Sequence, residues 1–268
     1  TSGGRIMIID THAHYDDEAF DKDREKLLDS MQNRGIEYIV NVGASIASCK
    51  TTVGLTRRFP NVYGALGVHP DEVASLTDED FDWLKHAIYK PKIVAVGEIG
   101  LDYHWNDNRD EQIAWFEKQM ELAREAELPI IVHSREAAKD TLDVMKASKA
   151  EEIGGIVHCF SYEKEMAREY IDMGFYLGIG GVITFKNARK LREVVEYAPM
   201  ENLVLETDCP YLSPEPNRGK RNSSLNIPYI VSAISEIKGI TPDEVVEITS
   251  NNAKKIYGIG LDDVDRLI

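Results

Sequence analysis

Short apolar runs rich in β-branched residues recur eight times, and stretches with helical periodicity separate them. The runs cover residues 6–9, 38–42, 62–68, 93–96, 130–132, 155–157, 175–179 and 203–205. Many are apolar throughout, which is typical of parallel strands covered by helices. One intervening stretch carries Ile113, Phe116, Met120 and Ala123, whose spacing predicts a single apolar helix face. Strand–helix units joined by right-handed crossovers therefore predict an α/β fold.

Eight such units favour a TIM-type (β/α)8 barrel with the site at the carboxyl ends of its strands. An open doubly wound sheet is the alternative, because it uses the same units in another strand order that one sequence does not resolve. One barrel domain over residues 1–268 is expected, since single α/β barrels of about 200 to 250 residues are common. Residues 1–6 precede a methionine at position 7 and are expected to be in part an expression remnant.

Two further signals lie near the carboxyl end. Thr241 and Glu244 form a capping-box pair around a proline, which predicts a helix over 242–257. The Pro- and Gly-containing segment 209–224 lacks an apolar period and is expected to be the longest loop. Loops of this length are often functional.

The overall charge restricts the partners that the chain can bind. The 46 acidic residues outnumber the 31 basic ones and give a net charge of −15, which argues against wrapping a long nucleic-acid duplex. Three cysteines without Cys-x-x-Cys spacing fit a reducing compartment. No apolar run approaches the roughly 18 residues of a membrane span. We therefore expect a cytoplasmic monomer with no membrane association and no obligate protein partner.

Side chains with metal-binding chemistry directly follow five of the apolar runs. His12 and His14 are two residues apart, so strand alternation sends both imidazoles to one side. The other candidates are Glu98, His133, His158 and Asp208, after the fourth, fifth, sixth and eighth runs. The carboxyl ends of barrel strands meet at one mouth, so these residues become neighbours only if the sheet closes.

Four imidazoles and two carboxylates exceed the ligand number that one cation usually takes, and a carboxylate can bridge two cations. The set therefore predicts two divalent metal ions and hydrolytic chemistry, in which the ions lower the pKa of a water molecule. No Gly-x-Ser-x-Gly or Gly-x-x-x-x-Gly-Lys-Ser/Thr motif supports another nucleophile. Asp102 is expected either to orient a ligand or to cap the following helix.

Six short segments occur in an order that matches a known family. They are Asp-Thr-His-Ala-His-Tyr-Asp at 10–16, Gly-Val-His-Pro at 67–70, Gly-Glu-Ile-Gly-Leu-Asp-Tyr at 97–103, Pro-Ile-Ile-Val-His-Ser-Arg-Glu-Ala at 129–137, His-Cys-Phe-Ser at 158–161 and Glu-Thr-Asp-Cys-Pro-Tyr-Leu-Ser-Pro at 206–214. Together they resemble the TatD-type metal-dependent deoxyribonucleases of the amidohydrolase-like barrel superfamily.

This resemblance implies roles for individual residues. One ion would be held by His12, His14, Glu98 and Asp208, and a second by Glu98, His133 and His158, with Glu98 as the bridge. Asp208 would orient or deprotonate the attacking water, and His69 would face the substrate or support the ligands. The family suggests activity with Mg²⁺, whereas imidazole ligands favour ions such as Zn²⁺ or Mn²⁺. The identity of the metal therefore stays open.

Three positions depart from the family pattern without removing a ligand. The leucine usual after the second histidine is Tyr15, the glycine after His-Cys-Phe-Ser is Tyr162, and the Glu-Pro usual after Gly-Lys-Arg-Asn is Ser223-Ser224. On this basis Tyr15 and Tyr162 are expected to narrow the mouth, and Ser224 to loosen its loop.

Basic residues on the long loop are the candidates for binding substrate. Arg218, Lys220, Arg221 and Asn222 cluster there in an otherwise acidic protein, which predicts a phosphate contact; a solvated loop tip is the alternative. Arg135 is a second phosphate candidate, unless it pairs with nearby carboxylates.

The function favoured by these patterns is a deoxyribonuclease acting on DNA ends or single strands, because an acidic protein gains little counterion release from a long duplex. One alternative is a binuclear amidohydrolase acting on a small amide, ester or phosphotriester, or on an aminoacyl-RNA ester. Another is a metal-holding barrel without catalytic activity.

Overall fold

Eight parallel strands form one sheet whose strand order follows the chain in the computed structural model, which describes residues 6–260. The strands are β1 (Ile8–Ala13), β2 (Ile36–Val42), β3 (Val62–Leu66), β4 (Ile93–Asp102), β5 (Ile130–Arg135), β6 (Gly155–Val157), β7 (Tyr176–Ile179) and β8 (Leu203–Leu205). A doubly wound sheet would reverse its strand order part-way, so the predicted TIM-type barrel is confirmed. Of the expected remnant 1–6, residues 1–5 lie outside the described range.

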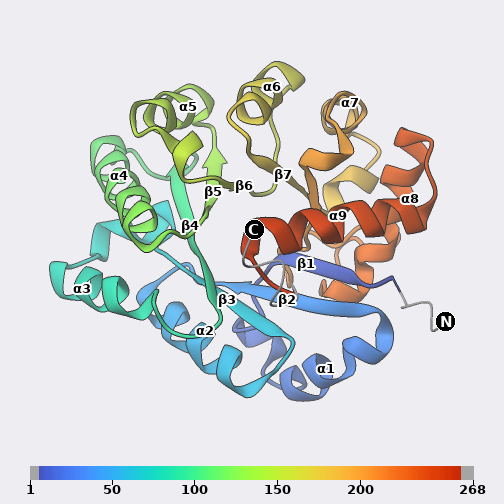
Figure 1. The fold of residues 1–268 in the computed structure, drawn as a ribbon, viewed down its shortest axis with the longest axis horizontal. Helices are drawn as coiled ribbons and strands as arrows, with labels where there is room; N and C mark the ends of the chain where they lie inside the picture. The colour runs from blue at the N-terminus through green and yellow to red at the C-terminus, as the bar shows by residue number, and fades with distance from the viewer. Residues whose placement is uncertain (1–5, 261–268) are drawn as a thin grey trace.

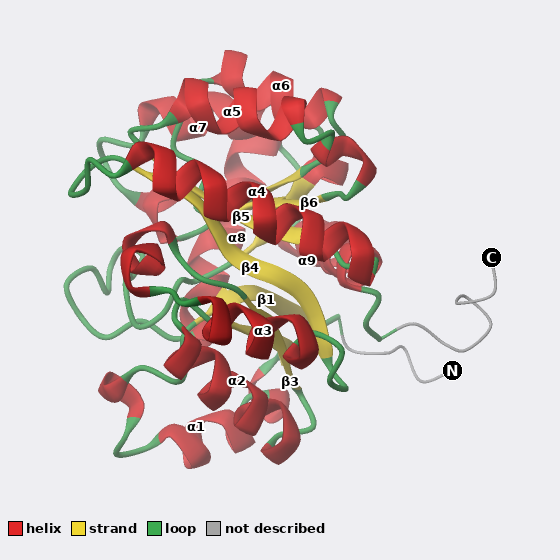
Figure 2. Cartoon of the chain, turned by 90° about the vertical axis from the view of Figure 1, so that its left-hand side faces the viewer, coloured by secondary structure: helices red, strands yellow, loops and turns green. Residues whose placement is uncertain are grey.

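Helices surround this sheet, as Figures 1 and 2 show. They are α1 (Arg24–Ser30), α2 (Ile46–Arg58), α3 (Asp78–Ala87), α4 (Arg109–Ala126), α5 (Ala138–Ala147), α6 (Lys164–Asp172), α7 (Arg189–Tyr197), α8 (Ile227–Lys238) and α9 (Pro242–Tyr257). Within residues 6–260, none of them is long and apolar enough to cross a membrane.

The barrel closes at a seam between β8 and β1. The Asp208 N–H donates to the His12 carbonyl at 2.9 Å, and the His14 N–H donates to the Cys209 carbonyl at 2.9 Å. These bonds lie at the carboxyl ends of the two strands, where the candidate ligands were predicted. Closure therefore brings residues from the two ends of the chain to one mouth.

The inside of the barrel is an apolar core that α9 closes at the opposite end. Ile9, Val42, Ala65 and other strand residues pack there with Ala253 and Tyr257 of α9. Figure 1 shows α9 lying across the ring of strands. A larger cluster fills the space between the strands and the outer helices. Within residues 6–260, the barrel is therefore left open for a polar site at the mouth formed by the carboxyl ends of the strands.

The elements agree with the sequence patterns except where polar residues continue a ladder. The capping signal correctly predicts α9, and Thr241 Oγ1 accepts the Glu244 N–H at 3.1 Å. However, β4 runs to Asp102 rather than Val96, because Gly100 and Asp102 still pair with β5. Glu98 therefore lies inside a strand, not after it.

Tyr15 and Ser224, two of the departures from the family pattern, contact each other beneath the mouth. Tyr15 is fully buried, and its hydroxyl oxygen lies 2.6 Å from Ser224 Oγ and accepts the Ser224 N–H at 2.8 Å. Ser224 Oγ also donates to Asp10 at 2.7 Å. The expectation that Tyr15 narrows the mouth is therefore wrong, as is the expectation that Ser224 loosens the loop. The two hydroxyls anchor the loop through these hydrogen bonds.

This pairing predicts coupled effects on stability. Ser223 is extended, with φ −152° and ψ 169°, so a proline fits after it at the first residue of a 3-10 turn (Ser224–Asn226). We expect Ser224→Pro to lower the free energy of unfolding by about 1–3 kcal/mol, because Tyr15 loses a buried donor. Tyr15→Leu is expected to lower the free energy of unfolding by a similar amount. The loss in the double variant is expected to be smaller than the sum of the two single losses by about 0.5–3 kcal/mol. Urea unfolding of the wild type, the two single variants and the double variant measures these free energies. A loss in the double variant equal to the sum of the two single losses would contradict the pairing.

Candidate metal centre

Six histidine and carboxylate side chains meet at the mouth of the barrel, and all but buried His12 line a cavity of about 680 Å³ there. They come from β1 and the residue after it, from β4 and β5, and from the segments after β6 and β8: His12, His14, Glu98, His133, His158 and Asp208. The structure thus brings together all six residues that the sequence analysis proposed as ligands.

One group of donor atoms surrounds the end of β1. His14 Nε2 lies 3.0 Å from Asp208 Oδ1 and 3.2 Å from His12 Nε2. Glu98 Oε2 lies 3.3 Å from His12 Nε2 and 3.7 Å from His14 Nε2. Ligand atoms held about 2.1 Å from a tetrahedrally coordinated ion lie roughly 3.4 Å apart. The atoms of His12, His14 and Asp208 therefore have the mutual spacing of metal ligands, and Glu98 Oε2 lies at a similar spacing from the two imidazoles.

A second group adjoins the first across Glu98. Glu98 Oε1 lies 3.0 Å from His133 Nδ1 and 3.4 Å from His158 Nε2. Three protein donors leave a coordination position for water or substrate, as catalytic sites do and closed structural sites do not. Each oxygen of buried Glu98 faces one group, so this carboxylate would be shared if both groups held a cation. The donor set fits divalent metal ions.

The charges of this cluster shift its protonation equilibria. Burial opposes ionisation of Glu98, but the neighbouring His158 and His12 outweigh it and hold the pKa of Glu98 well below its usual range. Burial also opposes protonation of the imidazoles, yet nearby carboxylates raise the pKa of His14 and His133 to about 9 and that of His158 to about 10. Without ions, protons on these imidazoles therefore balance the buried carboxylates.

Three of the four imidazoles are fixed by an acceptor on the nitrogen that faces away from the cluster. The pairs are His14 Nδ1 with the Val42 carbonyl at 2.8 Å, His133 Nε2 with Asp102 Oδ2 at 2.8 Å, and His158 Nδ1 with Glu206 Oε2 at 3.0 Å. Such an acceptor selects the tautomer whose other nitrogen is free to bind metal. Of the two roles considered for Asp102, the contact with His133 supports the orienting one.

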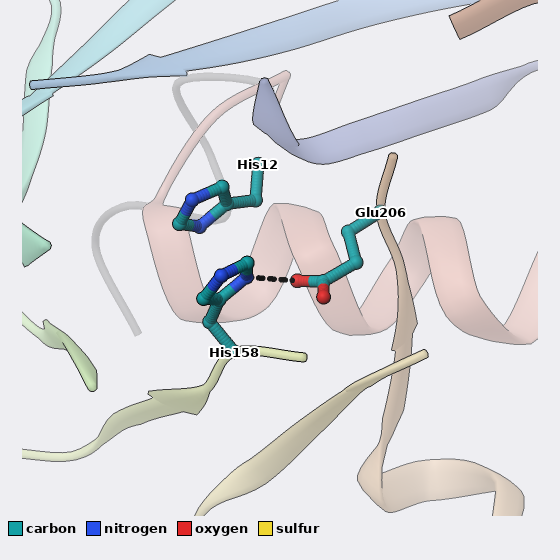
Figure 3. Close-up of side chains that lie close together, drawn as sticks. All are labelled: His12, His158 and Glu206. Atoms are coloured by element: carbon teal, nitrogen blue, oxygen red, sulfur yellow. Dashed lines mark hydrogen bonds and ion pairs between the residues drawn. The ribbon is translucent and has the colours of Figure 1, made fainter. Parts of the chain in front are cut away.

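Glu206 is a residue to which the sequence analysis gave no role. Its Oε1 accepts the Cys159 N–H at 2.6 Å while Oε2 holds His158, whose ring stacks on His12 with 3.5 Å between centroids (Figure 3). The carboxylate has room only because residue 178 is glycine, where a Cβ would lie 2.4 Å from Glu206 Oε2. The signal was present, because Glu206 and Asp208 stand two residues apart after an apolar strand.

His69 and Arg135, both predicted to face substrate, line the cavity. His69 Nδ1 accepts the Asp71 N–H at 3.0 Å, so Nε2 carries the proton and lies 3.7 Å from Glu98 Oε1. Burial lowers the pKa of His69 to about 4, which keeps the ring neutral near pH 7. His69 therefore presents an N–H donor to the cavity.

The long-loop residues predicted to grip phosphate are not among the described residues that line this cavity. Arg221 donates twice to Asp23, at 2.7 Å each, and the Arg218 guanidinium lies 3.8 Å from the centroid of the Phe185 ring. Lys220 is exposed. Asn222 is buried, and its amide donates to the carbonyls of Thr207 and Tyr211. Instead, Tyr211 and Leu212 of the same loop line the cavity.

Tyr162 also lies away from the cavity lining described within residues 6–260. Its hydroxyl oxygen is 2.8 Å from Ser134 Oγ and accepts the Ala137 N–H at 3.3 Å. The expectation that Tyr162 narrows the mouth is therefore wrong, because these bonds hold it against β5 and the start of α5.

Carboxylates dominate the rim of the cavity. Asp16, Asp17, Asp71 and Glu72 line it, and Arg135 is the one lysine or arginine among the described lining residues. A rim of this charge repels a long polyanion. The rim therefore favours substrates that bring few phosphates to the mouth.

Comparison with known proteins places the chain in a family. A family model described as "TatD related DNase" matches residues 9–258. The chain belongs to the TatD family. YabD of Bacillus subtilis, named an uncharacterized metal-dependent hydrolase, is 42% identical over 94% of this chain and 100% of its own length. TatD of Mycobacterium tuberculosis, also named an uncharacterized metal-dependent hydrolase, is 36% identical over 94% of this chain and 98% of its own length.

Solved structures agree with this membership. The crystal structure of YjjV, a TatD homolog from Escherichia coli K12, matches with a TM-score of 0.89 at 29% identity, over 94% of this chain and 98% of that one. The resemblance seen in the sequence is thus confirmed. Family membership and the donor set together assign this TatD-family chain to the metal-dependent hydrolases.

The contact between Glu206 and His158 predicts an effect on metal affinity. In Glu206→Gln, an amide replaces an acceptor that holds both His158 and the Cys159 N–H, so His158 is oriented less firmly. We expect metal affinity to fall about 10- to 100-fold without loss of the fold. Competition with a chromophoric chelator measures the affinity, and exposed Glu236→Gln on α8 is the matched control. Equal affinities in the two variants would contradict the role of Glu206.

The raised imidazole pKa values predict that metal binding releases protons. The ordinary histidine value is 6.5, so between about pH 6.5 and 9 the metal-free protein holds protons on His14, His133 and His158 that an ion must displace. Affinity for Mn²⁺ or Zn²⁺ is expected to rise with pH through this window and to level off near pH 10. Titration calorimetry at pH 7.5 in buffers of different ionisation enthalpy measures the release. Heats that do not depend on the buffer would contradict it.

Proposed function

We propose that the protein hydrolyses DNA phosphodiester bonds, at ends or in single strands, with a water molecule activated by two divalent cations. The main support is the geometry of Glu98, whose two oxygens face two separate donor groups at 3.3 Å and 3.0 Å. A single structural ion needs no such shared carboxylate. Two-ion sites are suited to displacement at phosphorus, where attacking and leaving oxygens both carry charge.

The chain's own residues would divide the work. The cations, when bound, lower the pKa of water and offset charge on the phosphate. Asp208 keeps 18% of its side chain exposed at the cavity and accepts the proton of the attacking water. The His69 N–H and the Arg135 guanidinium donate to the non-bridging phosphate oxygens. Arg218 and Lys220 are exposed on the long loop and would bind phosphates of a longer strand that lie outside the cavity.

The charge around the mouth supports ends and single strands over long duplexes. Four rim carboxylates and a net charge of −15 oppose the approach of many phosphates at once. A frayed or single strand can bring one phosphate to the cavity floor and keep the others away from the rim.

The same rim favours a second candidate function. A small amide, ester or phosphotriester, or the ester of an aminoacyl-RNA, places less negative charge against Asp16, Asp17, Asp71 and Glu72. Such substrates use the same activated water.

The proposed function predicts metal-dependent cleavage that needs Asp208. Protein reconstituted with Mn²⁺ or Mg²⁺ is expected to shorten an end-labelled single-stranded oligonucleotide. Asp208→Asn is expected to lower kcat about 10²- to 10⁴-fold, since it removes the proton acceptor. Glu236→Gln serves as the surface control.

A second pair of assays separates the two candidate functions. Arg135→Ala should weaken activity on phosphodiesters and spare a neutral ester. If metal-loaded protein leaves single-stranded and nicked DNA intact but hydrolyses neutral esters or aminoacyl-RNA, the DNA proposal fails and the second candidate stands.

A further inference from the structure

A smaller cavity of about 150 Å³ opens beside the metal centre. It lies between the segments that follow β6, β7 and β8, and it shares Cys159, Ser161, Asp208 and Leu212 with the main cavity. Asp208 therefore borders both spaces. A group attached directly to a phosphate at the cavity floor has this side cavity within reach.

The lining of the side cavity is mainly apolar inside and polar at its opening. Glu206 and Thr207 also line it, but their polar side-chain atoms are hydrogen-bonded within the protein. Phe160, Val182, Ala188 and Leu191 supply the apolar walls, and all four are buried or partly buried. Asn187 is exposed, as are Ser161 and Lys190. An apolar slot with hydrogen-bonding groups at its rim matches a planar group that has apolar faces and polar edges.

Three glycines, Gly178, Gly180 and Gly181, also line the side cavity, and packing requires only two of them to be glycine. A Cβ at Gly178 would lie 2.4 Å from Glu206 Oε2, and one at Gly181 would lie 2.3 Å from the Leu212 carbonyl oxygen. At Gly180 the nearest atom, the Glu206 carbonyl oxygen, would be 3.5 Å away, which is ordinary van der Waals contact. Its φ of −116° also suits any residue. The missing side chain at Gly180 therefore leaves space in the side cavity that the fold does not need.

We propose that the side cavity binds one unpaired nucleobase, attached to the nucleotide whose phosphate lies at the metal centre. This inference rests on the proposed phosphodiesterase function. A dry apolar cavity of roughly 150 Å³ holds a benzene-sized ring, so one base matches its scale and a base pair does not. The base must leave its partner to enter, which costs least in a single strand or at a frayed end. The side cavity thus gives a steric reason for the substrate preference that the acidic rim gives electrostatically.

The test compares a base with no base at the cleaved nucleotide. Single-stranded oligonucleotides carry either a normal nucleotide or an abasic tetrahydrofuran residue there, and kcat/KM is measured for each. Burying a base against apolar walls is expected to favour the normal substrate about 5- to 100-fold. Gly180→Ala should move this ratio toward one, and Ala188→Leu should move it further, because both fill the side cavity. Gly54→Ala on α2, where a Cβ meets nothing within 4 Å, is the matched control and should keep the wild-type ratio.

A binding measurement keeps this inference separate from the proposed function. Calorimetry compares deoxyadenosine monophosphate with deoxyribose 5-phosphate, and the wild type is expected to prefer the former in a way that Gly180→Ala reduces. If DNA is cleaved but the substrate ratio is near one, or is unchanged by Gly180→Ala, the base site is overturned and the nuclease function stands. If no DNA is cleaved, the nuclease function fails. The calorimetric comparison then decides alone. A preference for deoxyadenosine monophosphate that Gly180→Ala reduces supports the base site. No preference, or a preference that Gly180→Ala leaves unchanged, overturns the base site.

Discussion

The carboxylate of Asp10, on the first strand of the barrel, joins that strand to the segment that follows the last one. The position of the metal centre depends on this connection. Its oxygens accept the N–H groups of His12 and Thr207, each at 3.2 Å, and the Thr207 hydroxyl at 2.7 Å. The Ser224 hydroxyl donates to the same carboxylate at 2.7 Å. In the sequence, residues 10 and 207 are separated by nearly all of the strands and helices that form the barrel. Because His12 and Asp208 adjoin these bonded groups, the seam that closes the sheet also sets the spacing of the first donor group.

Sequence patterns predict the parts of this structure that depend on local burial. A strand covered on both faces must be apolar, so β6 and β8 appear at the predicted residues 155–157 and 203–205. Glycines and polar residues hide the true length of β4, because the strand continues through Gly97 and Glu98 and pairs again with β5 from Ile99 to Asp102. The candidate ligands could be found because each follows or continues a strand whose end must lie at the mouth.

The sequence does not show which residues far apart in the chain form hydrogen bonds or ion pairs with each other. Arg221 reads as a free phosphate-binding cation until its pairing with Asp23, 198 residues away, is known. The substitutions at Tyr15 and Ser224 read as two unrelated departures, yet their hydroxyls meet across 209 residues. Composition counts such groups correctly, but only the folded chain decides which of them are already neutralised or bonded. The same reason explains why Glu206 had no role before its contact with His158 was seen.

The electrostatics of the mouth links metal occupancy to substrate binding. Buried carboxylates are costly unless positive charge compensates them, and here either protons on the imidazoles or cations can do so. Ions bring more positive charge than the protons they replace, so they stabilise the folded chain by mass action and also leave a net attraction for an anion at the cavity floor. Since the rim carboxylates act against that attraction, the proposed function requires that a phosphate reach the floor itself to be held. Under the proposed function, selection among substrates falls to groups that act at short range, and the proposed ones are the His69 N–H, Arg135 and the walls of the side cavity.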